Sequence, residues 1–202
     1  ARQQMHVIRS VGPCCDYSLK PRSLVPHVKR VVWSVFLGRE PVLDDAARSR
    51  VLIYTRKNAD WRRILEAERL KPLFKPGLEV LIKDDVPPTL VEQAQLFSSA
   101  AVVLAPNGGW APNAVFMASD ACLIELHLYR EDSWVVMFGL GRELGEVLLI
   151  VGDYKDPAKP RVVRKGRVGG DDDFLISKGK QNLFKDIRRK MASSKVCKRY
   201  LA

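Results

Sequence analysis

Five short apolar runs, separated by segments with helical periodicity, constrain the fold of this chain more than any other feature of its sequence. The apolar runs are typical of strands and lie at residues 50–56, 78–84, 101–106, 121–126 and 146–153. The segments between them that are predicted to be helical are 60–70, 88–100, 112–119 and 133–144. Strands that are apolar throughout, rather than alternating, are typical of parallel sheets buried on both faces. We therefore expect an α/β fold, a single Rossmann-like lobe with a mostly parallel sheet of about five strands, helices on both faces and basic terminal extensions.

The lobe is expected to be flanked by two further segments. Residues 1–47 are predicted to form an N-terminal arm with a helix over 23–37, and residues 48–153 are predicted to form the Rossmann-like lobe. Residues 154–202 are predicted to form a basic loop, a C-terminal helix over 178–194 and a tail.

The charge of the chain is concentrated at its two ends. Residues 1–50 have nine Lys and Arg against four Asp and Glu, residues 51–150 have ten against thirteen, and residues 151–202 have fifteen against six. Basic ends suit an anionic partner, which here is RNA, anionic lipid or the acidic surface of another protein subunit. A solvated basic surface is the alternative interpretation.

Cysteine and histidine usage argues against a metal site and against a disulfide framework. The four cysteines are Cys14, Cys15, Cys122 and Cys197, none of them in a Cys-x-x-Cys motif, and the chain has three histidines. Metal-binding and disulfide-rich chains usually show regularly spaced cysteines. We predict no metal ligands, and we interpret Cys122 as a small core residue of the apolar run 121–126.

Membrane and secretion signals are not apparent in the sequence. No run approaches the roughly 18 apolar residues of a membrane-spanning helix, and the first ten residues have no apolar signal-peptide core. The first residue is Ala rather than Met, so we expect a processed product or a fragment.

Some other patterns are tempting but have simpler interpretations. The stretch GLGRELG at 139–145 has the glycine spacing of a dinucleotide-binding turn, but the next strand begins too soon for a crossover helix. We interpret it as a helix that ends at Gly145, and we interpret the three aspartates at 171–173 as part of a solvated loop. His27 is interpreted as structural, whereas His127 follows a strand, where ligands of open α/β sheets bind.

The strongest candidate for a ligand site is the stretch LAPNGGWAPNAVFM at residues 104–117. An apolar run, a glycine turn and a helical pattern follow one another, which is how α/β proteins form phosphate-binding turns. Arg56 and Lys57 end the first predicted strand, and a cation at that position is well placed for a phosphate. A surface pair is the alternative for these two residues.

The order of these segments resembles the C-terminal half of glycosyltransferase family 61. The similarity runs over about residues 48–193 and rests on VLIYTRKNADWRRILEAERL, VEQAQLFSSAAVVLAPNGGWAPNAVFM, ACLIEL and FGLGRELGEVLLIV. The family has a strand ending in Arg, an Arg-rich helix, a Glu-Gln pair, a His-Gly-Ala-x-Leu-Thr-Asn turn and an Ile-Glu strand. The residues that match this pattern are Arg56, Arg62, Arg63, Glu92, Gln93, Gly108, Asn113, Phe116 and Glu125.

This resemblance implies a two-lobed GT-B fold, of which the chain supplies the nucleotide-sugar-binding lobe. Arg56 then faces the donor diphosphate, Glu125 meets sugar or ribose hydroxyls, and the glycine turn before Asn113 offers amide donors at a helix N-terminus. Neither a metal nor a cofactor is implied. The full set of implied binding residues is Arg56, Arg62, Gly108, Gly109, Asn113 and Glu125.

The chain departs from the family pattern at the turn and in its length. Asn107 takes the place of the motif's His and cannot carry a proton, so no catalytic residue is predicted. Ala111 and Pro112 replace Leu-Thr, which removes one amide donor and one hydroxyl. The Trp110 ring is large enough to fill the crevice. About 47 residues precede the first strand, too few for a second Rossmann lobe.

These observations leave hypotheses from three classes. The preferred one is a degenerate, non-catalytic glycosyltransferase-like subunit that docks on other proteins of a larger assembly, such as a mitochondrial one. The second is an active, metal-independent glycosyltransferase of the secretory lumen whose other lobe is missing or lies on another chain. The third is a basic nucleic-acid-binding protein, for which the sequence has no aromatic-and-basic RNA motif.

Overall fold

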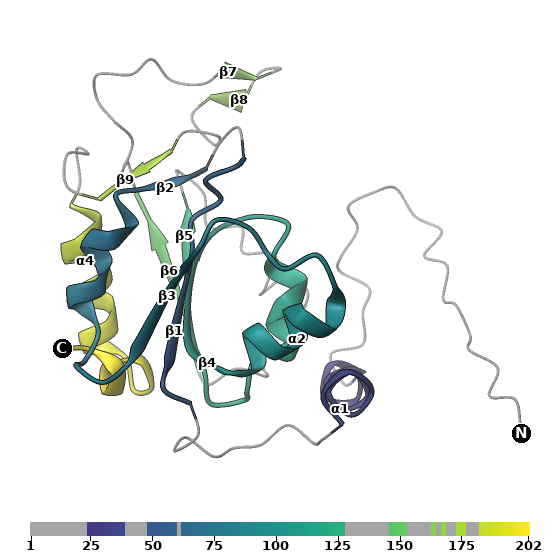
Figure 1. The fold of residues 1–202 in the computed structure, drawn as a ribbon. Coiled ribbons are helices and arrows are strands. Elements are labelled where there is room, and N and C mark those ends of the chain that lie inside the picture. The colour runs from purple at the N-terminus through teal and green to yellow at the C-terminus, as the bar shows by residue number, and fades with distance from the viewer. Residues whose placement is uncertain are drawn as a thin grey trace, which may run out of the picture.

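A five-stranded, wholly parallel sheet forms the centre of the computed structural model (Figure 1). The structure describes residues 24–38, 48–59, 62–127, 146–152, 163–164, 167–168, 173–176 and 182–202. The strand order is β3-β1-β4-β5-β6. The strands are β1 (Arg50–Tyr54), β3 (Glu79–Lys83), β4 (Ala100–Pro106), β5 (Cys122–His127) and β6 (Glu146–Val151). The predicted Rossmann-like lobe with a parallel sheet of about five strands is confirmed.

Burial along the strands explains why the runs are apolar throughout. Every residue of the two central strands β4 and β5 is buried, whereas the ends of the edge strand β3 are exposed. Side chains alternate between the two faces of a strand. On β5, Cys122 and Ile124 belong to one hydrophobic cluster and Leu123 to the other, so the sheet separates two cores.

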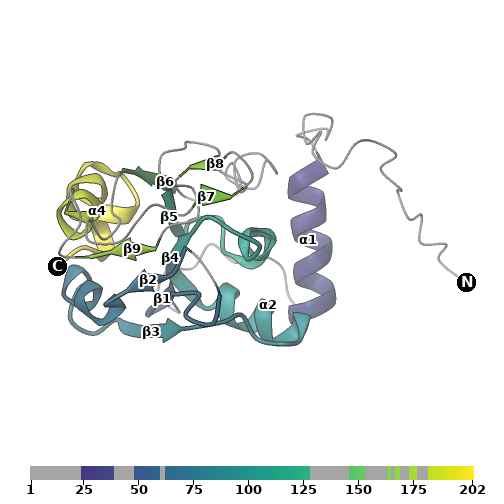
Figure 2. The same cartoon turned by 90° about the horizontal axis from the view of Figure 1, so that it is seen from above.

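Helices cover both faces of the sheet, as predicted (Figures 1 and 2). The elements on one face are α1 (Leu24–Leu37), α2 (Leu90–Ser98) and the 3-10 helix η4 (Ala111–Phe116). Those on the other face are α4 (Leu183–Ser193) and the 3-10 helices η3 (Ala67–Leu73) and η6 (Cys197–Tyr200).

The helices predicted at 23–37 and 88–100 correspond to α1 and α2. Helix α2 begins after Thr89, whose hydroxyl accepts from the backbone amide of Glu92 while the Glu92 carboxylate accepts from the backbone amide of Thr89. This capping box satisfies amides that otherwise lack partners at a helix start. Helix α1 is attached through Trp33, which is buried and donates from Nε1 to the Val115 carbonyl at 3.1 Å.

The helix predicted over 60–70 is wrong around Ile64, whereas residues 67–70 belong to the 3-10 helix η3. Ile64–Leu65 forms a short strand, β2, that pairs in parallel with β9 (Phe174–Leu175), and the first two residues of the predicted helix lie outside the described part. The backbones of Arg62 and Glu66 are left-handed, with φ of 56° and 60°, and an α-helix cannot continue through such residues. The apolar spacing that suggested a helix arises because Ile64 is buried from a strand.

Cys122 is a core residue, as interpreted from the sequence, but the structure corrects the expectation that the cysteines form no disulfide. Its sulfur is bonded to that of Cys197, with an S–S distance of 2.13 Å, so the disulfide joins β5 to η6. Both residues are fully buried. The two cysteines are 75 residues apart and belong to no motif, so their spacing did not indicate that they pair.

The C-terminal helix is shorter than the predicted 178–194, because α4 begins after Asn182, whose side-chain oxygen accepts from the Lys185 amide. Its inner side consists of Leu183, Ile187 and Met191. The loop predicted over 154–173 contains β7 (Val163–Arg164) and β8 (Arg167–Val168), which form an antiparallel pair, and Asp173 lies just before β9.

The segment 128–145, which includes the helix predicted at 133–144 and Gly145, lies outside the described residues, as do Cys14, Cys15 and residues 177–181. Within the described part of the chain, no helix combines the length and the apolar character needed to cross a bilayer.

Candidate functional site

The strand order puts a topological switch point between β1 and β4. The chain passes from β1 to β3 on one side, and the later strands β4, β5 and β6 are added on the other side. Connections that leave in opposite directions open the sheet at the carboxyl ends of the two strands, and ligands of open α/β sheets bind there. Arg56 follows β1 and Asn107 follows β4, so both lie at this point.

Two arginines converge on Asn107. The Nη1 atoms of Arg56 and Arg62 donate to the Asn107 carbonyl at 3.3 and 3.1 Å, and Arg62 Nη1 also donates to Asn107 Oδ1 at 3.2 Å. Both arginines have left-handed backbones, with φ of 58° and 56°. This conformation costs on the order of 1–3 kcal/mol for a residue with a side chain, and such residues cluster at functional sites.

Gly108 makes room for Arg56. A Cβ atom at position 108 would lie 2.6 Å from Arg56 Nη1 and 3.3 Å from its Cζ, closer than such atoms approach in proteins. Gly109 is exposed, and a Cβ atom there would meet nothing within 4 Å. Gly108 is therefore explained by the Arg56 side chain, which occupies the space that a side chain at position 108 would need. At position 109 there is space for a side chain.

Asn107 links the arginines to two buried groups on β5. Its Nδ2 donates to Glu125 Oε1 at 3.0 Å, and Glu125 Oε2 lies 3.4 Å from His127 Nε2. Glu125 is 0% exposed and His127 is 3% exposed. We call Arg56, Arg62, Asn107, Gly108, Glu125 and His127 the strand-end cluster.

Trp110 does not fill the strand-end edge, contrary to the expectation from its size. Its ring is buried and stacks on Phe97 with centroids 6.3 Å apart and 5° between the planes, in the core beneath α2. Its Nε1 donates to the Pro106 carbonyl at 2.5 Å. The Trp110 side chain therefore stabilises the turn from the side of the hydrophobic core.

The short helix predicted over 112–119 is the 3-10 helix η4 (Ala111–Phe116). Asn113 is buried inside η4 rather than at a helix start, and its amide donates to the Trp110 carbonyl at 2.8 Å. The Ala111 amide donates to the Gly108 carbonyl at 3.1 Å. The backbone amides of Ala111 and Asn113 are thus used within the turn. The backbone amides still predicted to donate to a ligand are those of Gly108 and Gly109.

Arg63 and Asp173 form a contact that the sequence did not suggest. Arg63 donates from Nε and Nη2 to Asp173 Oδ2 at 3.0 and 2.6 Å, and the Arg63 amide donates to Oδ1 at 2.9 Å. Asp173 is thus an anchor across 110 residues of chain, not a member of a solvated run; the other two aspartates lie outside the described residues. The contact holds β2, and with it the loop of Arg62, in place.

Tyr54, the last residue of β1, has a raised pKa. Burial of its hydroxyl is the main cause, Asp85 raises the pKa further, and Arg56 opposes the change. The hydroxyl therefore remains a proton donor through the physiological pH range.

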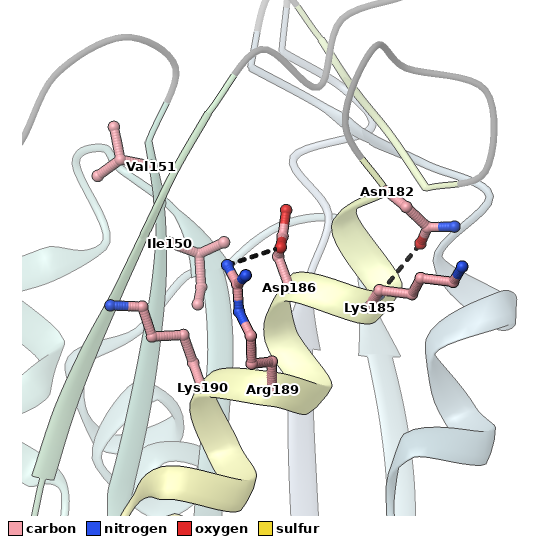
Figure 3. A pocket seen from close by; sticks show the side chains of 7 residues that line it. All are labelled: Ile150, Val151, Asn182, Lys185, Asp186, Arg189 and Lys190. Carbon is pink, nitrogen blue, oxygen red and sulfur yellow. Dashed lines mark hydrogen bonds and ion pairs between the residues drawn. The ribbon is translucent and has the colours of Figure 1, made fainter.

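A hollow of about 460 Å³ lies elsewhere, between the carboxyl end of β6 and helix α4 (Figure 3). Its lining residues are Ile150, Val151, Asn182, Lys185, Asp186, Arg189 and Lys190. Asp186 accepts from Arg189 at 3.0 Å and offsets part of the positive charge. The hollow lies away from the switch point. Because ligands of open α/β sheets bind at the switch point, we place the candidate site at the strand-end cluster. No group of three or more potential metal ligands occurs among the described residues.

The sequence model of the glycosyltransferase 61 family matches residues 17–124, more than half of the chain. The chain belongs to the glycosyltransferase 61 family. We found no curated protein that matches it. The match begins before residue 48, where we expected the resemblance to start, so it includes α1; it ends before Glu125 and does not cover the rest of the segment expected to extend to 193.

Three other residues that match the family 61 pattern support the fold of this member rather than the site. Glu92 belongs to the capping box of α2, and Gln93 Nε2 donates to the Pro87 carbonyl at 2.7 Å, at the start of the same helix. Phe116 is buried and packs edge-on against Phe36 of α1.

Proposed function

We propose that this chain is the nucleotide-sugar-binding lobe of a glycosyltransferase and that the donor diphosphate binds at the strand-end cluster. The observation that carries the proposal is the convergence of Arg56 and Arg62 on Asn107 at the switch point of the sheet. Guanidinium groups bind phosphate oxygens with paired hydrogen bonds and keep their charge at any physiological pH. Such a site can bind a diphosphate without a metal ion.

Two further observations support donor binding. Both arginines keep left-handed backbones, and Gly108 leaves the space that Arg56 occupies. Trp110, the residue best able to block the edge, is packed in the core instead. A turn that had lost its ligand would have no evident reason to keep the strained arginines.

A non-catalytic role is the second candidate, and the residue that favours it is Asn107. An amide cannot transfer a proton, so a domain with Asn at this position has lost the ionisable group of the family motif. In this role the domain is an accessory subunit that binds other proteins, or RNA or anionic lipid, through its basic ends. A mitochondrial or other organellar assembly was our expectation for that role.

The disulfide between Cys122 and Cys197 bears on the compartment. Structural disulfides persist in oxidising compartments and are rare where glutathione keeps thiols reduced. We therefore favour the lumen of the secretory pathway over a reducing matrix. The secretory lumen is a compartment in which an enzyme that uses a nucleotide sugar can act, whereas a subunit of a matrix assembly lies elsewhere.

Thermal unfolding with and without nucleotide tests the proposal. Uridine or guanosine diphosphate at about 100 times its dissociation constant adds roughly 2.7 kcal/mol to the stability of the folded chain. That corresponds to a rise of roughly 5–10 °C in melting temperature for a chain of this size. Arg56→Ala is expected to abolish the rise.

Arg69→Ala is the matched control, because Arg69 is an exposed arginine of η3 that pairs with Glu66, the residue just before that helix. It should keep the wild-type response. No rise with either nucleotide at millimolar concentration contradicts donor binding. Binding without any release of sugar from a nucleotide sugar points to the accessory role, and tight binding of RNA that weakens steeply with salt points to the nucleic-acid hypothesis.

A further inference from the structure

Two buried ionisable side chains of the strand-end cluster are unused by the proposed function. Glu125 and His127 are two residues apart on β5 and therefore point to the same side of the sheet. In the β4–β5 register, Ala105 lies opposite Glu125 and Pro106 opposite Leu126, which sets Asn107 beside His127. Buried groups of this kind need a partner or a function, because their desolvation is costly.

Hydrogen bonds lead from the arginines through Asn107 to Glu125, and the Glu125 carboxylate in turn lies close to the imidazole without a hydrogen bond to it. Arg62 donates to Asn107 Oδ1 at 3.2 Å, which leaves Asn107 Nδ2 to donate to Glu125 Oε1 at 3.0 Å. Glu125 Oε2 then faces His127 Nε2 at 3.4 Å. A carboxylate beside one ring nitrogen orients an imidazole and stabilises its protonated form, while the other nitrogen is left to meet a ligand.

The charge of the cluster does not match that of a donor when His127 is neutral. Arg56 and Arg62 contribute two positive charges and the Glu125 carboxylate contributes one negative charge. With neutral His127 the strand-end cluster therefore has a net charge of +1. The diphosphate of a nucleotide sugar has two negative charges. One proton on His127 makes the two charges equal and opposite.

We infer that His127 is the titratable cation of the donor site and takes up a proton when the diphosphate of a nucleotide sugar binds. The inference rests on the proposed function, because it needs a diphosphate at the cluster. Glu125 is then a positioning residue that holds the ring, rather than a residue that meets sugar hydroxyls. The site therefore still has an imidazole, that of His127 on β5, although position 107 has Asn in place of the family motif's His.

Lys57 and Asp84, from the ends of β1 and β3, lie 3.9 Å apart and compensate each other's charge. Asp85 accepts from the uncharged amide of Asn58 at 2.7 Å and keeps its negative charge, which acts on Tyr54 at the end of β1. The β4–η4 turn contributes no charged side chain, and the residue of β6 opposite His127 is Val151. Among the described residues, Glu125 is the charged side chain next to His127, and Arg56 and Arg62 are linked to Glu125 through Asn107.

Calorimetric titration in buffers of different ionisation enthalpy tests the inference. The probes are uridine diphosphate glucose and guanosine diphosphate mannose, whose phosphates do not titrate near neutral pH. The wild-type chain should take up protons when it binds either probe near neutral pH. His127→Gln should take up almost none, and its affinity should fall about tenfold at pH 6.5 and much less at pH 8.5.

His27→Gln is the control, because His27 is an exposed histidine of α1. It should keep the wild-type proton uptake. Asn107→His in the His127→Gln background should restore part of the uptake, because it places an imidazole next to Glu125 again. Nitrogen-15 spectra of the wild-type chain give a readout without any variant: the probe should move the ring signals of His127 and not those of His27.

Each outcome decides between the two proposals. Failure of the wild-type chain to bind either probe overturns the proposed function, and the inference with it. Binding with equal proton uptake in the wild type and in folded His127→Gln overturns the inference alone. Unmoved His127 ring signals in a wild-type chain that binds the probe also overturn the inference alone.

Discussion

Arg56 and Gly108 depend on each other at the scale of single residues. The guanidinium of Arg56 occupies the space that a side chain at position 108 would need, with 2.6 Å between its Nη1 and the position of a Cβ. The glycine is therefore explained by a close approach, since its φ is not among the positive values. The pair places a guanidinium directly against the turn.

Gly108→Ala should separate binding from stability. The added methyl group displaces the flexible end of Arg56 rather than backbone, so we expect a stability change within about 1 kcal/mol. Nucleotide affinity should fall about tenfold or more, because the guanidinium moves away from the diphosphate. Titration calorimetry and chemical denaturation measure the two effects.

Gly109→Ala is the matched control, since it adds the same methyl group one residue along, where nothing lies within 4 Å, and keeps its amide. It should leave both quantities close to the wild type. Equal losses of affinity in the two variants would show that the turn as a whole, and not the Arg56 contact, is what matters.

At the scale of elements, the short pair β2–β9 holds the arginine loop to the C-terminal part of the chain. Asp173 accepts from both the side chain and the amide of Arg63, next to Arg62. Asp173→Asn keeps the volume and removes the charge. We expect a loss of about 1–2 kcal/mol in the free energy of unfolding, as for hydrogen bonds to charged groups, and a weaker affinity for nucleotide because Arg62 is less well held.

Glu68→Gln tests whether any lost ion pair has this effect. Glu68 is 70% exposed and pairs with Lys71 within η3, so its loss should cost under about 0.5 kcal/mol. Denaturant unfolding measures both variants. Similar small losses in the two would mean that Asp173 is not the anchor described above.

The elements that sequence analysis predicted well are those with a continuous apolar signal. The five runs became the five strands because burial on both faces leaves few positions for polar residues. Helix α2 was predictable from its apolar spacing and its Thr89–Glu92 cap. The segment around Ile64 was predicted wrongly because its conformation depends on pairing with Phe174, which is 110 residues away, and on the left-handed Arg62 and Glu66.

The candidate site was predictable only in part for the same reason. Arg56, Arg62, Gly108 and Glu125 were identified because they follow apolar runs or match a family motif. Sequence analysis did not pair His127 with Glu125, although Glu125 is two residues before it on the same strand. Spacing of two within a strand places both side chains on one face, and that signal was available.

At the scale of the whole molecule, the disulfide connects the central sheet to the C-terminal segment. Closing a loop of about 75 residues stabilises a chain by about 4 kcal/mol in the chain-entropy account, and measured values are mostly 2–4 kcal/mol. Replacing both Cys122 and Cys197 by Ala should lower the free energy of unfolding by about that amount. Reductant should destabilise the wild type similarly and have little further effect on the double variant.

The double variant keeps Cys14 and Cys15, so any remaining response to reductant in it comes from those two. Equal stability of the wild type and the double variant under oxidising conditions would contradict the structural role of the disulfide. It would also remove the basis for favouring an oxidising compartment.

The most direct measurement is the affinity of the chain for uridine or guanosine diphosphate compared with that for the corresponding nucleoside, in the wild type and in Arg56→Ala. If the strand-end cluster holds the diphosphate, the wild type binds one of the diphosphates at least about a hundredfold more tightly than its nucleoside. Arg56→Ala should lose most of that difference while Arg69→Ala keeps it. Equal affinities for diphosphate and nucleoside in the wild type would contradict the account.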